Sequence, residues 1–140
     1  MYRKIIVAID MAALEKAEPA LRRAASLLET GGEIIVLNVV EDLTAALIID
    51  LPQDYVAEAI DDARGKLKEL CERLEITAVI EIRAGSPAAT ILKTAAEAAA
   101  DLIIVSSHVP DLSNYFLGAT ADRVVRHAKC SVLVDRRKKG

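Results

Sequence analysis

The sequence predicts an α/β fold, a three-layer sandwich in which four helices cover both faces of a five-stranded parallel sheet. Short β-branched runs alternate along the 140 residues with longer stretches whose apolar residues recur at helical spacing. An alternation of strand and helix requires parallel strands joined by right-handed crossovers. Several of the strand runs are apolar almost throughout, as expected for strands buried on both faces. The length suits one domain, residues 1–140.

The five strands are predicted from runs rich in Ile and Val, residue types that favour a pleated surface. They cover residues 4–9, 33–39, 77–83, 102–106 and 131–135. The first, second and fourth runs are apolar almost throughout, which is typical of strands buried on both faces.

The first helix is predicted from apolar residues at helical spacing between Leu14 and Leu28. Pro19 disfavours a helix interior, so we expect the regular helix to begin near Pro19 or to kink there. Gly31 and Gly32 follow and predict a left-handed stop after the helix.

Three further helices follow along the chain. The second is predicted over about residues 54–73. Ser86 suits an N-cap and Pro87 a first helical position, so the third helix begins there and continues through an alanine-rich stretch. The fourth follows Gly118 and ends near His127, whose positive charge when protonated would complement the helix C-terminus.

The composition narrows the classes of function. A net charge of −3 argues against a general affinity for nucleic acid, and the short basic tail at 136–139 is expected to be solvated. Two cysteines, Cys71 and Cys130, are too few for a disulfide framework and are expected to be free thiols, with Cys71 on the buried face of its helix. No apolar run is long enough for a membrane span, and the N-terminus lacks a signal-peptide pattern. We therefore expect a cytoplasmic protein.

Residues 41–53 form the longest predicted irregular segment, long enough for a lid or a contact surface. Leu47, Ile48 and Ile49 within it would need cover, for example from a partner chain.

The candidate binding site lies where the strands end. In a parallel sheet, ligands bind outside the carboxyl ends of the strands, where helix N-termini present free N–H groups. Asp10 and Val39 stand at the ends of the first two strands, and Gly118 opens the last helix after the loop that begins at Ser106. These loops are expected to converge.

These loops, together with the stretch LGATADRVVRHAKCSVLV, resemble the universal stress protein family across essentially the whole chain. The resemblance implies the strand order 3-2-1-4-5. The segments SHVPDLSNYFLG and DLPQDYVAEAIDDAR are similar to members associated with TRAP-type transporters. A transporter or regulatory protein is the partner that this likeness implies.

In ATP-binding members of the family, a loop of the form G-x2-G-x9-G-(S/T) wraps the phosphates, since glycines allow backbone N–H groups to approach the oxygens. The corresponding residues are Ser106, Val109, Gly118 and Ala119, so Gly118 alone keeps the pattern, and the second spacing is one residue shorter. Thr120 offers a hydroxyl one position later than the family places it.

The resemblance also implies roles outside this loop. Asp10 corresponds to the carboxylate near the ribose or a magnesium ion, Val39 to the position whose backbone binds the adenine edge, and Gly85 to a glycine after the third strand. Taken alone, these residues also fit a turn carboxylate, a core residue and a turn glycine. His108 fits either a phosphate contact or a structural hydrogen bond. The candidate nucleotide-binding residues are Asp10, Val39, Gly85, Ser106, His108, Gly118, Ala119 and Thr120.

The predicted function is that of a small stress-response regulatory protein that binds ATP, or AMP or ADP, with or without magnesium, and modulates a partner. The alternative is a nucleotide-independent, dimeric interaction module with a degenerate phosphate loop. The resemblance implies a homodimer through the last strand, from Ser131 to Arg136. Because no Walker, adenylyl-transfer or nucleophile-elbow motif is present, at most slow residual nucleotide hydrolysis is expected, and no catalytic or metal-ligating residue is assigned.

Overall fold

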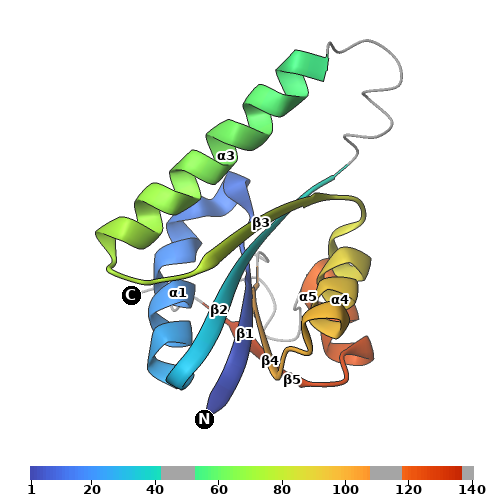
Figure 1. Ribbon diagram of the computed structural model, residues 1–140. Helices are drawn as coiled ribbons and strands as arrows, with labels where there is room; N and C mark the ends of the chain where they lie inside the picture. The colour runs from blue at the N-terminus through green and yellow to red at the C-terminus, as the bar shows by residue number, and fades with distance from the viewer. Residues whose placement is uncertain (42–52, 108–117, 137–140) are drawn as a thin grey trace.

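The computed structural model describes residues 1–41, 53–107 and 118–136 (Figure 1). The predicted irregular segment therefore lies outside the described residues except for Glu41 and Gln53. His108 and Val109 also lie outside them.

The sheet has five parallel strands in the order β3-β2-β1-β4-β5, which confirms the predicted fold class and strand order. The strands are β1 (Tyr2–Ala8), β2 (Leu28–Val40), β3 (Val79–Ala84), β4 (Leu102–Ser106) and β5 (Ser131–Asp135). The helices are α1 (Ala17–Leu27), α3 (Gln53–Arg73), α4 (Pro87–Ala98) and α5 (Ala119–His127), and a short 3-10 helix, η1 (Met11–Lys16), precedes α1.

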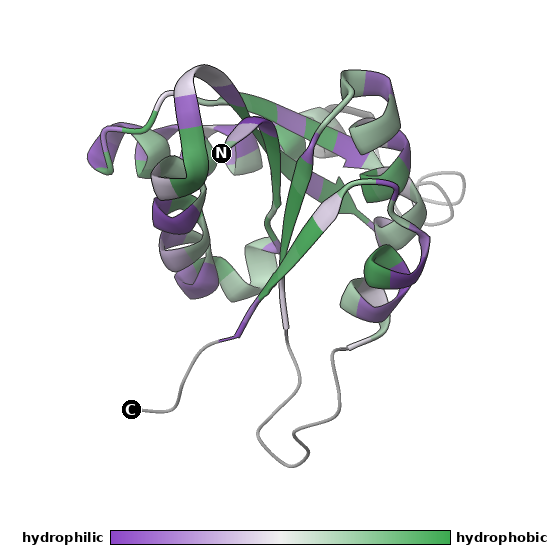
Figure 2. Cartoon of the chain, turned by 90° about the horizontal axis from the view of Figure 1, so that it is seen from below, coloured by the Kyte–Doolittle hydropathy of each residue, from purple (hydrophilic) through white to green (hydrophobic). Residues whose placement is uncertain are grey.

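Two hydrophobic cores lie on opposite faces of the sheet. One packs α1 and α3 against residues such as Ile5, Val7 and Ile104, and the other packs α4 and α5 against Ile6 and Ile103. Figure 1 shows the two helix pairs on either side of the strands, and Figure 2 shows the apolar strands enclosed between them. The apolar runs within β1, β2 and β4 are buried, as predicted: residues 5–7, 34–37 and 102–105. The result is the expected three-layer sandwich.

The first helix begins as the proline predicted, but its end was predicted wrongly. The 3-10 helix η1 contains a non-helical Ala13 and gives way to α1 at Ala17, which puts Pro19 in the first turn of α1. Gly31 and Gly32 do not stop the helix. They lie inside β2, where the register against β1 shifts between the pairs that begin at Leu28 and Glu33.

The physical reason is that β2 begins directly after α1, and its pairing with β1 is irregular between Leu28 and Glu33, where β2 has more residues than β1. Gly31 has a φ of +84°, so its left-handed conformation is used inside a strand rather than at a helix end. A Cβ on Gly32 would lie 2.7 Å from the carbonyl oxygen of Arg3, so the close approach of β1 requires glycine there.

The remaining helices lie close to their predicted bounds. Ser86 occupies the N-cap position of α4 with an extended backbone, but its side chain makes no capping hydrogen bond. Helix α4 ends before Ala100, because Ala99 adopts the left-handed conformation with φ of +54°. Cys71 is buried on the inner face of α3, as predicted, and burial raises the pKa of its thiol. No helix among the described residues is both long and apolar enough to cross a membrane.

Asp101 ties the starts of β1 and β4 together. Its two carboxylate oxygens accept hydrogen bonds from the backbone N–H groups of Arg3 and Lys4, both at 2.9 Å. Although partial burial acts in the opposite direction, these bonds lower the pKa of Asp101. The end of the sheet opposite the strand carboxyl termini is therefore fixed by a charged clamp.

Candidate functional site

A pocket of about 150 Å³ lies at the carboxyl edge of the sheet, where the sequence predicted the site. Residues from the ends of β1, β2 and β4 and from the starts of α4 and α5 line it. These residues are Ala8, Ile9, Asp10, Leu37, Val39, Glu41, Pro87, Ile91, Val105, Ser106 and Thr120. Four predicted site residues, Asp10, Val39, Ser106 and Thr120, thus share one pocket.

Asp10 stands at the end of β1, where it caps η1. One carboxylate oxygen accepts a hydrogen bond from the backbone N–H of Ala12 at 2.9 Å, so the turn role considered for Asp10 is present. The exposed side chain also lines the pocket. The two roles are compatible, because a carboxylate has further acceptor positions after one hydrogen bond.

Asn38 positions the residue before Asp10. This buried side chain of β2 donates from Nδ2 to the carbonyl oxygen of Ile9 at 2.9 Å, while the N–H of Ile9 donates to the carbonyl of Leu37 at 2.8 Å. Both backbone groups of Ile9 are therefore bonded to β2 beyond the end of the β1 strand. The direction in which the chain turns into Asp10 is fixed from the neighbouring strand.

Gly85 does not line the pocket, but it fixes the turn between β3 and α4 beside the end of β2. Its N–H donates to the carbonyl of Val40 at 3.1 Å, directly after Val39. Its φ is +143°, and a Cβ there would lie 2.8 Å from Oγ1 of Thr90. The turn from β3 into α4 therefore favours glycine on two grounds, and it places Pro87 and Ile91 against the pocket.

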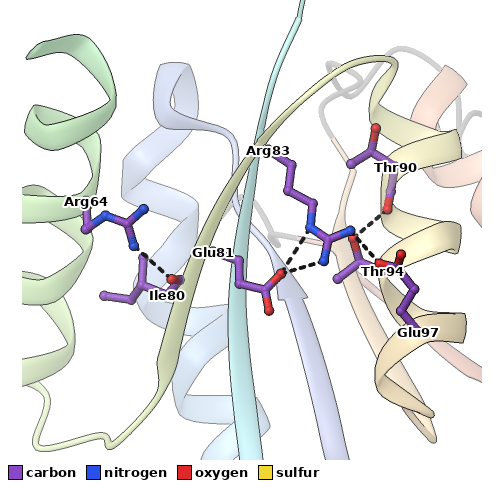
Figure 3. Close-up of polar contacts among 7 residues, drawn as sticks. All are labelled: Arg64, Ile80, Glu81, Arg83, Thr90, Thr94 and Glu97. Carbon is purple, nitrogen blue, oxygen red and sulfur yellow. Dashed lines mark hydrogen bonds and ion pairs between the residues drawn. The ribbon is translucent and has the colours of Figure 1, made fainter. Parts of the chain in front are cut away.

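Charged contacts tie β3 to the neighbouring helices, as Figure 3 shows. The guanidinium of Arg83 contacts Glu81 on its own strand at 3.1 Å and Glu97 on α4 at 2.6 Å. The hydrogen bond from Arg83 lowers the pKa of Glu97. On the other side, Arg64 of α3 donates to the carbonyl oxygen of Ile80 at 3.1 Å. These contacts hold β3 against α3 and against α4, the helix that carries the pocket residues Pro87 and Ile91.

The other wall comes from β4 and α5. Ser106 ends β4, and its strand partner is Asp135 of β5. Gly118 precedes α5 with φ of +88°, a conformation that favours glycine, and half-buried Thr120 in the first turn reaches the pocket. Ala119 is exposed and, like Gly118, does not line the pocket. The first N–H groups of α5 lack partners within the helix, so this edge offers donors to an anion.

The pocket combines an apolar slot with a polar rim. Leu37, Val39, Ile91 and Val105 offer surface to a flat apolar group, while Asp10, Glu41, Ser106 and Thr120 offer oxygen atoms. In the described part of the chain, no cluster of three His, Cys, Asp or Glu side chains could hold a metal ion. The arrangement therefore suits a small molecule with a flat ring and several hydroxyl groups.

Sequence reasoning missed Glu41, Pro87, Ile91 and the supporting residue Asn38. Glu41 comes directly after β2, and Pro87 comes three residues after β3 at the start of α4. The rule that ligands bind where strands end and helices begin would have included both residues. Asn38 was detectable as a lone amide in an apolar strand run. Ile91 had no signal in the sequence, because any buried face of α4 would show the same apolar spacing.

Comparison with known proteins gives a match over nearly the whole chain. The model of the "Universal stress protein family" matches residues 1–136. Universal stress protein G of Shigella flexneri is 28% identical over 142 aligned positions, which cover 97% of this chain and 100% of that protein.

Solved structures agree with the fold. The structure of hypothetical protein MJ0577 superposes with a TM-score of 0.80 at 26% identity, covering 100% of this chain and 99% of that one. A universal stress protein in complex with cAMP has a TM-score of 0.60 at 21% identity and coverages of 96% and 97%. A family member from Arabidopsis thaliana with AMP bound has a TM-score of 0.62 at 17% identity and coverages of 97% and 92%. At these lower identities the likeness concerns the fold.

Proposed function

Because the chain belongs to the universal stress protein family, we propose that it is a regulatory protein that binds an adenine nucleotide in the pocket at the carboxyl edge of its sheet. The observation that carries this proposal is that Asp10, Val39, Ser106 and Thr120, which come from four separate elements, line one pocket. Family members with cAMP and AMP support the ligand class.

In this proposal the base occupies the apolar slot between Val39 and Ile91, and the ribose lies near Asp10. The phosphates extend toward Gly118 and the first turn of α5, where the N–H groups and the helix dipole favour negative charge. ATP, ADP and AMP share this framework. Magnesium, when present, arrives bound to the phosphates.

The protein acts in this proposal by binding rather than by catalysis. Rapid hydrolysis needs a positioned base, a clamp of positive charge and usually a metal ion. The pocket offers two carboxylates, Asp10 and Glu41, and its described lining carries no lysine or arginine. The nucleotide would then change the affinity for a protein partner, for which the transporter-associated likeness remains a prediction.

A thermal-shift titration tests nucleotide binding. At 100 times the dissociation constant, a ligand stabilises the folded state by about 2.7 kcal/mol. At about 2.1 cal/mol/K per residue, a chain of 140 residues rises by about 9 °C in Tm. Absence of any shift with millimolar AMP, ADP or Mg-ATP would exclude the proposal.

A matched pair of variants locates the ligand. Thr120→Tyr puts a ring on the pocket rim and should weaken nucleotide binding about tenfold or more. Val125→Tyr makes a similar change at an exposed position of the same helix, where 44% of the residue is accessible, and should leave binding unchanged. Equal effects of the two variants would place the ligand elsewhere.

A second candidate is a homodimeric interaction module that works without nucleotide. The sheet order leaves β5 at one edge, and the stretch from Ser131 to Arg136 provides a strand for pairing across a two-fold axis. Ala119, which stands where nucleotide-binding members carry a hydroxyl, favours this candidate. Sedimentation of the protein without ligand tests the dimer, and a monomer at micromolar concentration would exclude it.

A further inference from the structure

The rim of the pocket has a charge that opposes phosphate binding. Its described lining includes the carboxylates of Asp10 and Glu41 and no lysine or arginine. The stretches 42–52 and 108–117, outside the described residues, contain no lysine or arginine in their sequence either. A phosphate group beside two carboxylates meets repulsion unless a positive charge lies nearby. Beyond the N–H groups of α5 and the imidazole of His108, a lysine or arginine charge at this edge would therefore come from elsewhere in the chain.

Lys16 is the basic side chain that the structure brings to the end of β4. It is the last residue of η1, the helix that Asp10 caps. Its ammonium group donates from Nζ to the carbonyl oxygen of Ser107 at 2.8 Å, and Ser107 follows the pocket residue Ser106. Lys16 thus links the connection after β1 to the first residue beyond β4, the two places from which Asp10 and Ser106 enter the pocket.

The ammonium of Lys16 retains capacity for an anion. A lysine ammonium has three N–H donors, and the bond to Ser107 uses one of them. Within residues 1–41, 53–107 and 118–136, Lys16 takes part in no ion pair, although the neighbouring residues Glu15 and Glu18 carry carboxylates. A neutral carbonyl carries no charge to offset that of the ammonium, so the Lys16 side chain can also attract an anion.

Several other basic residues are already paired with carboxylates. Arg83 is bound to Glu81 and Glu97, and Arg126 is bound to Asp122 on α5. Arg23 of α1 is bound to Asp135 at the end of β5.

We infer that Lys16 is the phosphate-recognition residue of this site: its ammonium fixes the chain at Ser107 and supplies the positive charge that lets an acidic pocket accept a nucleotide. The inference rests on the proposed function. Lys16 is then the side chain that makes the site bind a nucleotide more tightly than a nucleoside.

Calorimetric titration of adenosine, AMP and Mg-ATP against four proteins tests the inference. The proteins are the native chain, Lys16→Met, Lys16→Arg and Lys66→Met. Lys66→Met removes the same charge from α3, where Lys66 pairs with Asp62, and serves as the matched control. Circular dichroism melts confirm that each variant is folded.

The expected result is a loss that depends on the phosphate. Lys16→Met should weaken AMP about tenfold and Mg-ATP by at least as much, while adenosine changes less than about twofold. Lys16→Arg should restore most of the affinity for AMP, and Lys66→Met should match the native chain.

Three outcomes would overturn the inference. Equal losses for adenosine and AMP would assign Lys16 a purely structural role. Unchanged affinity for AMP in Lys16→Met would assign the phosphate to the backbone of α5 or to the basic tail. If the native chain bound adenosine, AMP and Mg-ATP not at all, the proposed function itself would fail, and the role of Lys16 with it.

Discussion

Replacing Asn38 with alanine would test how the site is held in place. Asn38 is 5% exposed, and its amide donates a hydrogen bond to the carbonyl of Ile9, directly before Asp10. The alanine variant removes this donor from a buried environment. It leaves the Ile9 carbonyl without its partner at the end of β1.

The expected cost follows from the burial of both groups. A buried carbonyl that loses its partner costs about 1–3 kcal/mol, and the small cavity left by the amide adds to this. We therefore expect a loss of about 2–3 kcal/mol in the free energy of unfolding. With an unfolding entropy of about 0.3 kcal/mol/K for 140 residues, Tm should fall by about 7–10 °C.

Thr94→Ala provides the matched control for this measurement. Thr94 is the other buried polar residue in the described chain, and its Oγ1 donates to the carbonyl of Thr90 at 2.7 Å. That carbonyl lies within helix α4 and keeps a helical partner, so a loss of about 1 kcal/mol is expected. Thermal and urea unfolding of both variants would be compared. A loss for Asn38→Ala no larger than that for Thr94→Ala would refute the reasoning.

Three further changes have expected outcomes. Gly65→Ala, in the interior of α3 with nothing within 4 Å of the added Cβ, should raise the free energy of unfolding by about 0.5–1 kcal/mol in urea denaturation. Gly32→Ala should lower it by about 1–3 kcal/mol in the same assay, because its Cβ would lie 2.7 Å from the Arg3 carbonyl oxygen; an unchanged midpoint would contradict the geometry. Asp101→Asn should cost about 1 kcal/mol at pH 7. Because the folded pKa of Asp101 is lowered, its carboxylate stabilises the fold above the unfolded pKa of about 3.9, and the difference from the native chain should vanish as the pH falls through the folded pKa.

The sequence predicted the fold well because the strands are marked by composition. Runs such as residues 102–106 and 131–135 were placed with the bounds that the structure has, since Ile and Val clusters end abruptly at polar residues. The largest error in an element boundary was at the start of β2, around Gly31 and Gly32. A glycine pair looks the same at a helix end and in a strand irregularity, and the deciding fact was the carbonyl of Arg3, which is distant in sequence.

The candidate site was predicted in part. The rule that ligands bind at strand carboxyl ends singled out Asp10, Val39 and Ser106, and these residues line one pocket; their role in binding a nucleotide stays a prediction. Gly85 was singled out by resemblance, and the structure gives it a role in the wall rather than in the lining. Contacts between side chains and distant backbone, such as those of Asn38 and Lys16, leave no periodic pattern and could not be predicted.

The two edges of the sheet differ in a way that limits how copies of the chain can assemble. At β3, the Arg64 guanidinium donates a hydrogen bond to the backbone carbonyl oxygen of Ile80. The charged side chains of Glu81 and Arg83 follow on the same strand. Such an edge resists pairing with another strand. If two copies pair through β5, each copy covers its β5 edge and leaves its charged β3 edge exposed. Growth would then end at the dimer, and a filament of continuous sheet would be excluded.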